Sequence, residues 1–138
     1  MTSDPKKIMI VEDQPEVADL FEEMLSLDGY QVGKIHSSTG ALSVIRAEKP
    51  DIVLLDIMMP DVSGLEVLHF MQREPDLQNI PVVIVSARTL PTDIRAGLDA
   101  GATVYLTKPV DMGTLRRTVA QVLGTAEGSA GPVTGSDE

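Results

Sequence analysis

Residues 52–60 read IVLLDIMMP, four branched apolar residues followed at once by an aspartate. A continuously apolar run of this length is typical of a strand buried on both faces, because alternating polar residues are needed only where one face meets water. Helices that cover both faces are the crossover connections of a parallel sheet. We therefore predict a central parallel strand that carries Asp56 at its carboxyl end.

Four further short runs rich in Ile and Val occur along the chain, at 8–11, 32–35, 82–85 and 104–106. The run at 82–85 is also continuously apolar, whereas the run at 32–35 is the most polar and indicates an edge strand. Longer stretches with helical spacing separate the runs, and this alternation predicts repeated β-α-β units. The predicted fold class is α/β, a five-stranded parallel sheet with helices on both faces.

Helices are predicted between the strands from apolar residues that recur at i, i+3, i+4 and i+7. Thr39, Ser63 and Asp111 each precede such a stretch and can cap it by accepting a hydrogen bond from the first turn. Gly29 can end the first helix in the left-handed conformation. The stretch 91–100 predicts a shorter and weaker fourth helix.

The length and composition indicate one acidic domain. A chain of 138 residues is close to the common size of a single domain. We place that domain at residues 1–123 and interpret residues 124–138, rich in glycine and serine with an acidic end, as a flexible tail or linker. The tail could be a natural terminus or could lead to an output domain.

The charge balance excludes several partners. With 21 acidic and 11 basic residues the net charge is −10, which disfavours direct binding to nucleic acid or to an anionic membrane surface. The chain has no cysteine and no apolar segment long enough for a signal peptide or a membrane span. We therefore expect a cytoplasmic protein.

Polar side chains follow four of the five predicted strands. Glu12 and Asp13 follow the first strand, Asp56 the third, Ser86 the fourth and Lys108 the fifth. Ligands of open parallel sheets bind beyond the carboxyl ends of the strands, and right-handed crossovers bring those ends to one edge. We expect these five side chains to form one site.

The residue types at this edge suit phosphoryl transfer. Three carboxylates 4–5 Å apart would repel one another by about 3–4 kcal/mol per pair at an effective dielectric near 20, so a cation is needed. Oxygen ligands in a partly wet site favour Mg²⁺, and Lys108 adds a fixed charge. Both keep Asp56 ionised, and only the ionised form is a nucleophile. A carboxylate nucleophile, a metal ion, a lysine and a hydroxyl are the minimal set for this chemistry.

Four motifs, in this order and spacing, resemble the receiver domain of two-component response regulators, in particular those of the chemotaxis-regulator type. They are IMIVEDQPEV (8–17), LLDIMMPDVSGLEVL (54–68), VVIVSA (82–87) and VYLTKPVDM (104–112). The resemblance covers residues 6 to about 123. It implies a flavodoxin-like sheet of order 2-1-3-4-5 and transfer of a phosphoryl group from a histidine kinase or phosphotransfer protein to Asp56.

The resemblance also implies roles for single residues. Glu12 and Asp13 would bind Mg²⁺, with Asp56 and the backbone carbonyl of Met58 as further ligands. Ser86 and Lys108 would contact the phosphoryl oxygens. Ser86 and Tyr105 would form the switch, and Pro109 would follow a cis peptide. Such a domain is not a conventional enzyme but catalyses its own phosphorylation and dephosphorylation at Asp56.

The charge that phosphorylation adds predicts a surface that changes with it. We expect this surface to be built from the fourth and fifth helices and the fifth strand, and to bind a downstream protein or output domain. Met58 and Arg88 would flank the phosphoryl group, where neither side chain activates a water molecule and both long side chains can shield the site. We therefore expect a comparatively long-lived phosphoryl group.

Each residue also has an ordinary structural interpretation. An aspartate at a strand end is commonly a turn residue, and Glu12 and Asp13 could merely favour the dipole of the following helix. A tyrosine in a short strand often only packs, and His36 and His69 we interpret as surface residues. At the level of function, the alternative is a protein-binding module of the same fold that never uses phosphate.

Overall fold

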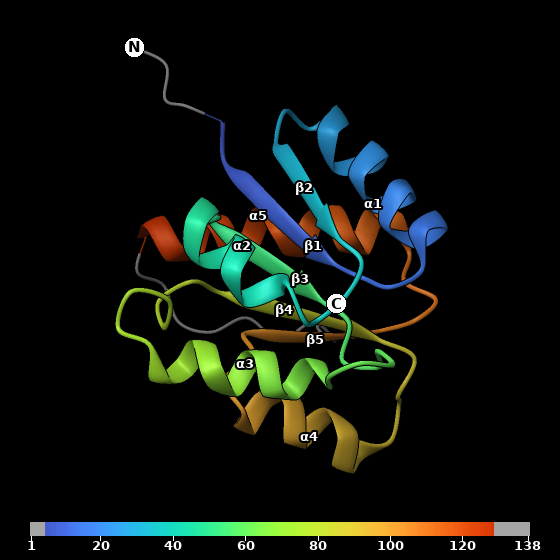
Figure 1. Cartoon of the computed structure of the whole chain (residues 1–138). Coiled ribbons are helices and arrows are strands. Elements are labelled where there is room, and N and C mark those ends of the chain that lie inside the picture. The colour runs from blue at the N-terminus through green and yellow to red at the C-terminus, as the bar shows by residue number, and fades with distance from the viewer. Residues whose placement is uncertain (1–4, 129–138) are drawn as a thin grey trace.

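Five parallel strands form one sheet in the order β2-β1-β3-β4-β5 in the computed structural model, which describes residues 5–128 (Figure 1). The strands are β1 (Lys7–Val11), β2 (Gln31–Ile35), β3 (Ile52–Leu55), β4 (Val82–Ser86) and β5 (Val104–Thr107). The helices between and after them are α1 (Pro15–Leu27), α2 (Ala41–Glu48), α3 (Gly64–Arg73), α4 (Pro91–Asp99) and α5 (Met112–Gly128). The predicted flavodoxin-like architecture and strand order are confirmed.

Helices cover both faces of the sheet. Helices α1 and α5 pack on one face, and α2, α3 and α4 pack on the other (Figure 1). Successive residues of β3 alternate between the two cores: Ile52 and Leu54 face α1 and α5, while Val53 and Leu55 face α2 and α3. All four are at most 1% exposed, and each such side chain contributes roughly 1.5–3 kcal/mol of hydrophobic stabilisation. This double burial explains the uninterrupted apolar run.

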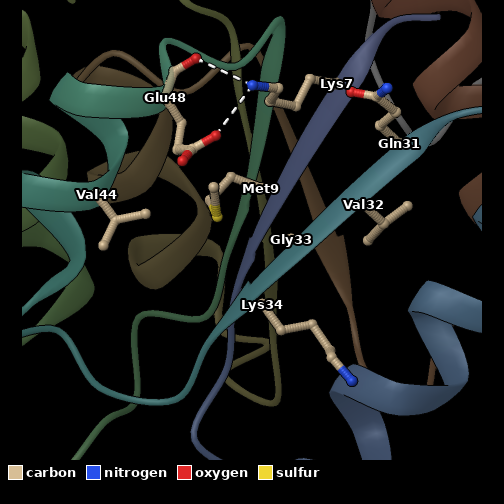
Figure 2. A pocket seen from close by; sticks show the side chains of 8 residues that line it. All are labelled: Lys7, Met9, Gln31, Val32, Gly33, Lys34, Val44 and Glu48. Carbon is tan, nitrogen blue, oxygen red and sulfur yellow. Dashed lines mark hydrogen bonds and ion pairs between the residues drawn. The ribbon is translucent and has the colours of Figure 1, made fainter.

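The partly exposed edge of the sheet is β2, as its polarity predicts. Beside it lies a hollow of about 330 Å³ whose floor includes Met9 and Gly33 (Figure 2). A side chain at Gly33 would meet Met9, since a Cβ built there lies 3.2 Å from its methyl carbon. Lys7 closes one end by bonding Glu48 of α2 at 3.0 Å, whereas Lys34 points away and pairs with Asp19 of α1 at 2.6 Å (Figure 2). Lys34 thus ties the edge strand to α1, and its charge discourages pairing with another strand, whereas Lys7 ties the neighbouring strand β1 to α2.

Three of the predicted helix ends have the expected geometry. The Ser63 hydroxyl accepts a hydrogen bond from the Leu65 N–H at 3.2 Å and caps α3. Asp111 accepts from the Thr114 N–H at 3.0 Å at the start of α5. Gly29, just after α1, has a φ of +92°, which glycine adopts without strain.

The prediction that Thr39 caps α2 is wrong. The N-cap residue is Gly40, and no side chain caps this helix. Thr39 is instead held by Asp61, which accepts from its N–H at 2.8 Å and from its hydroxyl at 2.5 Å. The Thr39 hydroxyl, followed by backbone N–H groups of the two loops, holds the pKa of Asp61 well below its usual range. A carboxylate from a distant loop thus competes successfully for the predicted cap.

The last helix is longer than its apolar pattern suggests. Helix α5 extends to Gly128, past residue 124 where we predicted the tail to begin. The remainder of the predicted tail, 129–138, lies outside the described residues. None of the helices in the described part of the chain is long and apolar enough to cross a membrane.

Gly64 allows the loop after β3 to close over the end of that strand. Its N–H donates to the Ile57 carbonyl at 3.2 Å. A Cβ at this position would lie 2.5 Å from the Asp56 carbonyl oxygen and 2.6 Å from the Ile57 Cα, and backbone atoms of a buried strand end cannot move aside easily. Glycine is therefore required here for packing rather than for an unusual φ.

We predict that Gly64→Ala lowers the free energy of unfolding by about 2–3 kcal/mol, because the added methyl group overpacks the backbone. The matched control is Gly124→Ala, on the exposed side of α5 where a Cβ meets nothing within 4 Å. This control should stabilise the protein by about 0.5 kcal/mol, because alanine favours a helix interior. Urea unfolding followed by circular dichroism measures both, and equal effects would contradict the packing argument.

Candidate functional site

The strand ends converge on one edge of the sheet, where backbone hydrogen bonds hold the first residue beyond each strand. The Asp56 N–H donates to the Val11 carbonyl at 3.0 Å, and the Lys108 N–H donates to the Ser86 carbonyl at 2.8 Å. The Glu12 N–H similarly donates to the last residue of β2 at 2.9 Å. The sheet therefore fixes the backbone position of each of these three charged residues.

The ammonium group of Lys108 bridges two buried carboxylates. Its Nζ lies 2.8 Å from Glu12 Oε1 and 3.1 Å from Asp56 Oδ2. The Glu12 and Asp56 side chains are 2% and 6% exposed, while that of Lys108 is 18% exposed. Burying a charge is costly unless it is paired, so this lysine is what permits two carboxylates to be so deeply buried.

The two other hydrogen bonds to these carboxylates come from backbone N–H groups. Met58 N–H donates to Asp56 Oδ1 at 2.9 Å, and Gln14 N–H donates to Glu12 Oε2 at 3.3 Å. One carboxylate oxygen of Asp56 therefore accepts from Lys108, and the other accepts from the loop after β3. The carboxylate cannot rotate without losing one of these contacts.

The site contains more negative than positive charge. Oxygen atoms of Glu12, Asp13 and Asp56 all lie within 4.8 Å of one another. Burial, with the neighbouring charge of Asp56, raises the pKa of Glu12 even though Lys108 opposes the shift. Burial lowers the pKa of Lys108, but its contacts with Glu12 and Asp56 outweigh this and raise it overall. Three carboxylates facing one lysine form a donor set suited to a small divalent cation.

Ser86 and Tyr105 are connected through the backbone of Arg88. The Ser86 hydroxyl, fully buried at the end of β4, accepts from the Arg88 N–H at 3.1 Å. The Arg88 carbonyl accepts from the Tyr105 hydroxyl at 2.9 Å. Tyr105 is 8% exposed, so its ring packs in the core beneath α4. A movement of Ser86 would therefore be transmitted to Tyr105 through the backbone of Arg88.

An open hollow of about 800 Å³ lies beside the carboxylates. The residues that line it include Asp13, Met58, Pro60, Arg88, Asp93 and Ala96. The Met58 side chain is 46% exposed at this hollow. A partner group can therefore reach the mouth of the site although the carboxylates themselves are buried.

The structure brings together four of the predicted site residues, Glu12, Asp13, Asp56 and Lys108. Ser86 and Tyr105 are joined to each other, and the Met58 backbone contacts Asp56 through its N–H. The functional roles of these residues remain predictions. The Lys108–Pro109 peptide is cis, as the resemblance implied, and His36 and His69 are exposed, as we interpreted them.

Some contacts near the site have no signal in the sequence. The His36 Nδ1 lies 3.0 Å from the Glu12 carbonyl oxygen, although the histidine is on the surface. Asp61 joins the loop after β3 to the loop after β2, where Ser38 also donates to the Val62 carbonyl at 2.6 Å. These contacts join loops that are distant in sequence, so periodicity and spacing along the chain do not reveal them.

Comparison with known proteins places the chain in one family. The family model described as "Response regulator receiver domain" matches residues 8–120. The chain is 34% identical over 122 residues to the "Polar-differentiation response regulator DivK" of Brucella anthropi, covering 88% of this chain and 99% of that protein. The protein of the same name from Brucella ovis is 34% identical over 121 residues, with 88% of this chain and 98% of that protein covered.

Solved structures agree with this. A "response regulator receiver domain protein (CheY-like)" from Methanospirillum hungatei has a TM-score of 0.85 at 26% identity, over 91% of this chain and 99% of that one. A "putative response regulator" from Chloroflexus aurantiacus has a TM-score of 0.83 at 29% identity, over 87% of this chain and 98% of that one.

The excess of negative charge should cost stability in the metal-free protein. We predict that Asp13→Asn raises the free energy of unfolding by about 1 kcal/mol, the value for a charge pair at this separation in a largely aqueous surrounding. Thermal unfolding in the presence of a chelator measures this. The control Asp99→Asn, on the exposed end of α4, should change it by less than about 0.5 kcal/mol. A destabilised Asp13→Asn would mean that the cluster is not under repulsion.

Proposed function

Because the chain belongs to the response-regulator receiver family, we propose that it is a phosphoacceptor switch that receives a phosphoryl group on Asp56. The donor would be a phosphohistidine of a sensor kinase or phosphotransfer protein. The observation that carries this proposal is the single lysine that bonds both Glu12 and Asp56, next to an open hollow that Asp13 and Met58 line.

The transfer exchanges one bond for another. A carboxylate oxygen of Asp56 bonds to phosphorus while the bond from phosphorus to the donor's imidazole nitrogen breaks, and the imidazole leaves with that electron pair. Lys108 and the Met58 N–H hold the two oxygens of Asp56, so the nucleophile is oriented before the donor arrives. Positioning of this kind and neutralisation of charge account for most of the catalysis in phosphoryl transfer.

Ser86 would stabilise the product. Its oxygen already accepts the Arg88 N–H, so its own proton is available for a phosphoryl oxygen. Lys108 would supply a second, charged donor, as hydrogen bonds to ionised groups are the stronger ones. The phosphoryl group would thus be held from the ends of β4 and β5.

The donor set fits Mg²⁺. Glu12, Asp13 and Asp56 would hold the ion together with the Met58 carbonyl, all of them the hard oxygen ligands that Mg²⁺ prefers. When bound, the ion would neutralise negative charge on the cluster and on the phosphoryl oxygens. Burial, followed by the neighbouring charge of Asp56, raises the pKa of Glu12, and a bound cation would favour its ionised form instead.

The output would pass through the α4-β5-α5 face. Phosphorylation adds a charge of about −1.5 to −2, which would draw in Ser86 and bias a pre-existing equilibrium between two arrangements of the loop after β4. Arg88 and Tyr105 carry that change to α4 and β5 through the contacts described above. A downstream protein or output domain would bind this face, and we place the protein in the cytoplasm.

A phosphate-independent binding module of the same fold is the alternative. We predict that acetyl phosphate with Mg²⁺ phosphorylates the protein, that a chelator prevents it, and that Asp56→Ala abolishes it because no other carboxylate in the described part of the chain bonds both Lys108 and the loop after β3. Intact-mass spectrometry measures the product. The control Asp99→Ala should be phosphorylated normally, and a wild-type protein that takes up no phosphoryl group would favour the alternative.

Met58 should set the lifetime of the phosphoryl group. Its thioether lies at the mouth of the hollow and cannot orient a water molecule for hydrolysis. We predict that Met58→Asn shortens the lifetime roughly tenfold, a fraction of what a fully positioned acid–base group supplies. Decay of the phosphorylated protein measures this, with Val62→Asn on the same loop as the control. A wild-type decay as fast as that of Met58→Asn would rule out the shielding role.

A further inference from the structure

Arg88 has contacts with three parts of the molecule. Its N–H donates to Ser86 at 3.1 Å, its carbonyl accepts from Tyr105 at 2.9 Å, and its guanidinium pairs with Asp93 at 3.5 Å. Asp93 lies in the first turn of α4. One residue therefore touches the end of β4, the aromatic residue of β5 and the start of α4.

The ion pair with Asp93 is a weak one. The Arg88 side chain is 55% exposed, and a distance of 3.5 Å is long for a charge-assisted hydrogen bond. Exposed pairs of this kind contribute little because water screens them. Asp93 also has a second source of stabilisation, since a carboxylate in the first turn favours the dipole of its helix. The guanidinium can therefore leave at small cost.

Arg88 also lines the open hollow beside the carboxylates, together with Asp93, Asp13 and Met58. The Met58 N–H bonds Asp56, so this hollow adjoins the nucleophile. The backbone of Arg88 is fixed beside Ser86, so only rotation of its side chain is needed to change what it faces. Lys108 is already engaged by Glu12 and Asp56, whereas Arg88 is the cation among the described residues that line the hollow.

We infer that Arg88 exchanges partners when Asp56 is phosphorylated. In the unmodified protein Asp93 holds the guanidinium, and in the phosphorylated protein the guanidinium binds the phosphoryl oxygens and releases Asp93. A phosphoryl group carries about twice the charge of a carboxylate and matches the planar fork of arginine. This inference rests on the proposed function and adds a second link from the site to α4, independent of Ser86 and Tyr105.

The exchange predicts opposite effects for the two residues, because Asp93 competes with the phosphoryl group for the Arg88 guanidinium. Removing the cation should weaken binding of a phosphoryl mimic, whereas removing the competitor should strengthen it. Once Arg88 is absent, the charge of Asp93 should no longer matter in this way. If the ion pair were purely structural, removing either Arg88 or Asp93 would weaken binding of the phosphoryl mimic.

The test is a titration of the Mg²⁺-loaded protein with beryllofluoride, followed by NMR. Arg88→Ala should weaken binding about tenfold, the value of one charge-assisted hydrogen bond. Asp93→Asn should tighten it about threefold, the size of a surface ion pair. The double variant should bind like Arg88→Ala, and the controls Arg95→Ala and Asp99→Asn, on the exposed side of α4, should bind like the wild type.

Hydrogen exchange supplies a readout that affinity does not. Beryllofluoride should lower protection of amides 93–96, in the first turns of α4, in the wild type but not in Arg88→Ala. Weaker binding by Asp93→Asn, a tightening that persists without Arg88, or unchanged exchange in α4 would each overturn the inference. A wild-type protein that binds beryllofluoride while these effects are missing leaves the phosphoacceptor function standing, whereas no binding at all removes both.

Discussion

The contact of the Lys108 ammonium with Glu12 and Asp56 is the interaction on which the functional edge of this protein depends. Each carboxylate follows a buried strand, so the sheet places both where water cannot solvate them fully. Without the lysine, two buried negative charges would face each other at a distance where repulsion amounts to several kcal/mol. The fifth strand is thus more than part of the fold, because it delivers the one side-chain cation that contacts these carboxylates among residues 5–128.

The parallel topology makes that contact possible, but a single lysine does not balance the carboxylates gathered at this edge. Glu12 and Lys108 are 96 residues apart in sequence, yet both follow strands whose carboxyl ends lie on one edge. Asp13 adds a third carboxylate to the cluster and no second lysine accompanies it among the site residues. The cluster therefore carries more negative than positive charge, a balance that favours a cation.

Much of this arrangement could be predicted from sequence because it follows from strands. Uninterrupted apolar runs indicate buried parallel strands, and the residues that follow parallel strands lie at one shared edge, as Asp56 and Lys108 do. Contacts between loops could not be predicted in this way. Thr39 stands at the usual position of a helix cap, but its hydroxyl bonds Asp61 of another loop. Helix α5 continues to Gly128, beyond the last residue of its apolar pattern.

Arg88 shows that the partner of an exposed side chain cannot be predicted from strand topology. Its position two residues after Ser86 is evident from sequence, and sequence alone suggests that its long side chain shields the phosphoryl group. In the structure the side chain turns to Asp93 of α4 instead. Shielding then requires leaving Asp93, so a residue that protects the phosphoryl group necessarily also alters the start of α4. The lifetime of the signal and its transmission would for that reason share one guanidinium, and a change at Arg88 would alter both together.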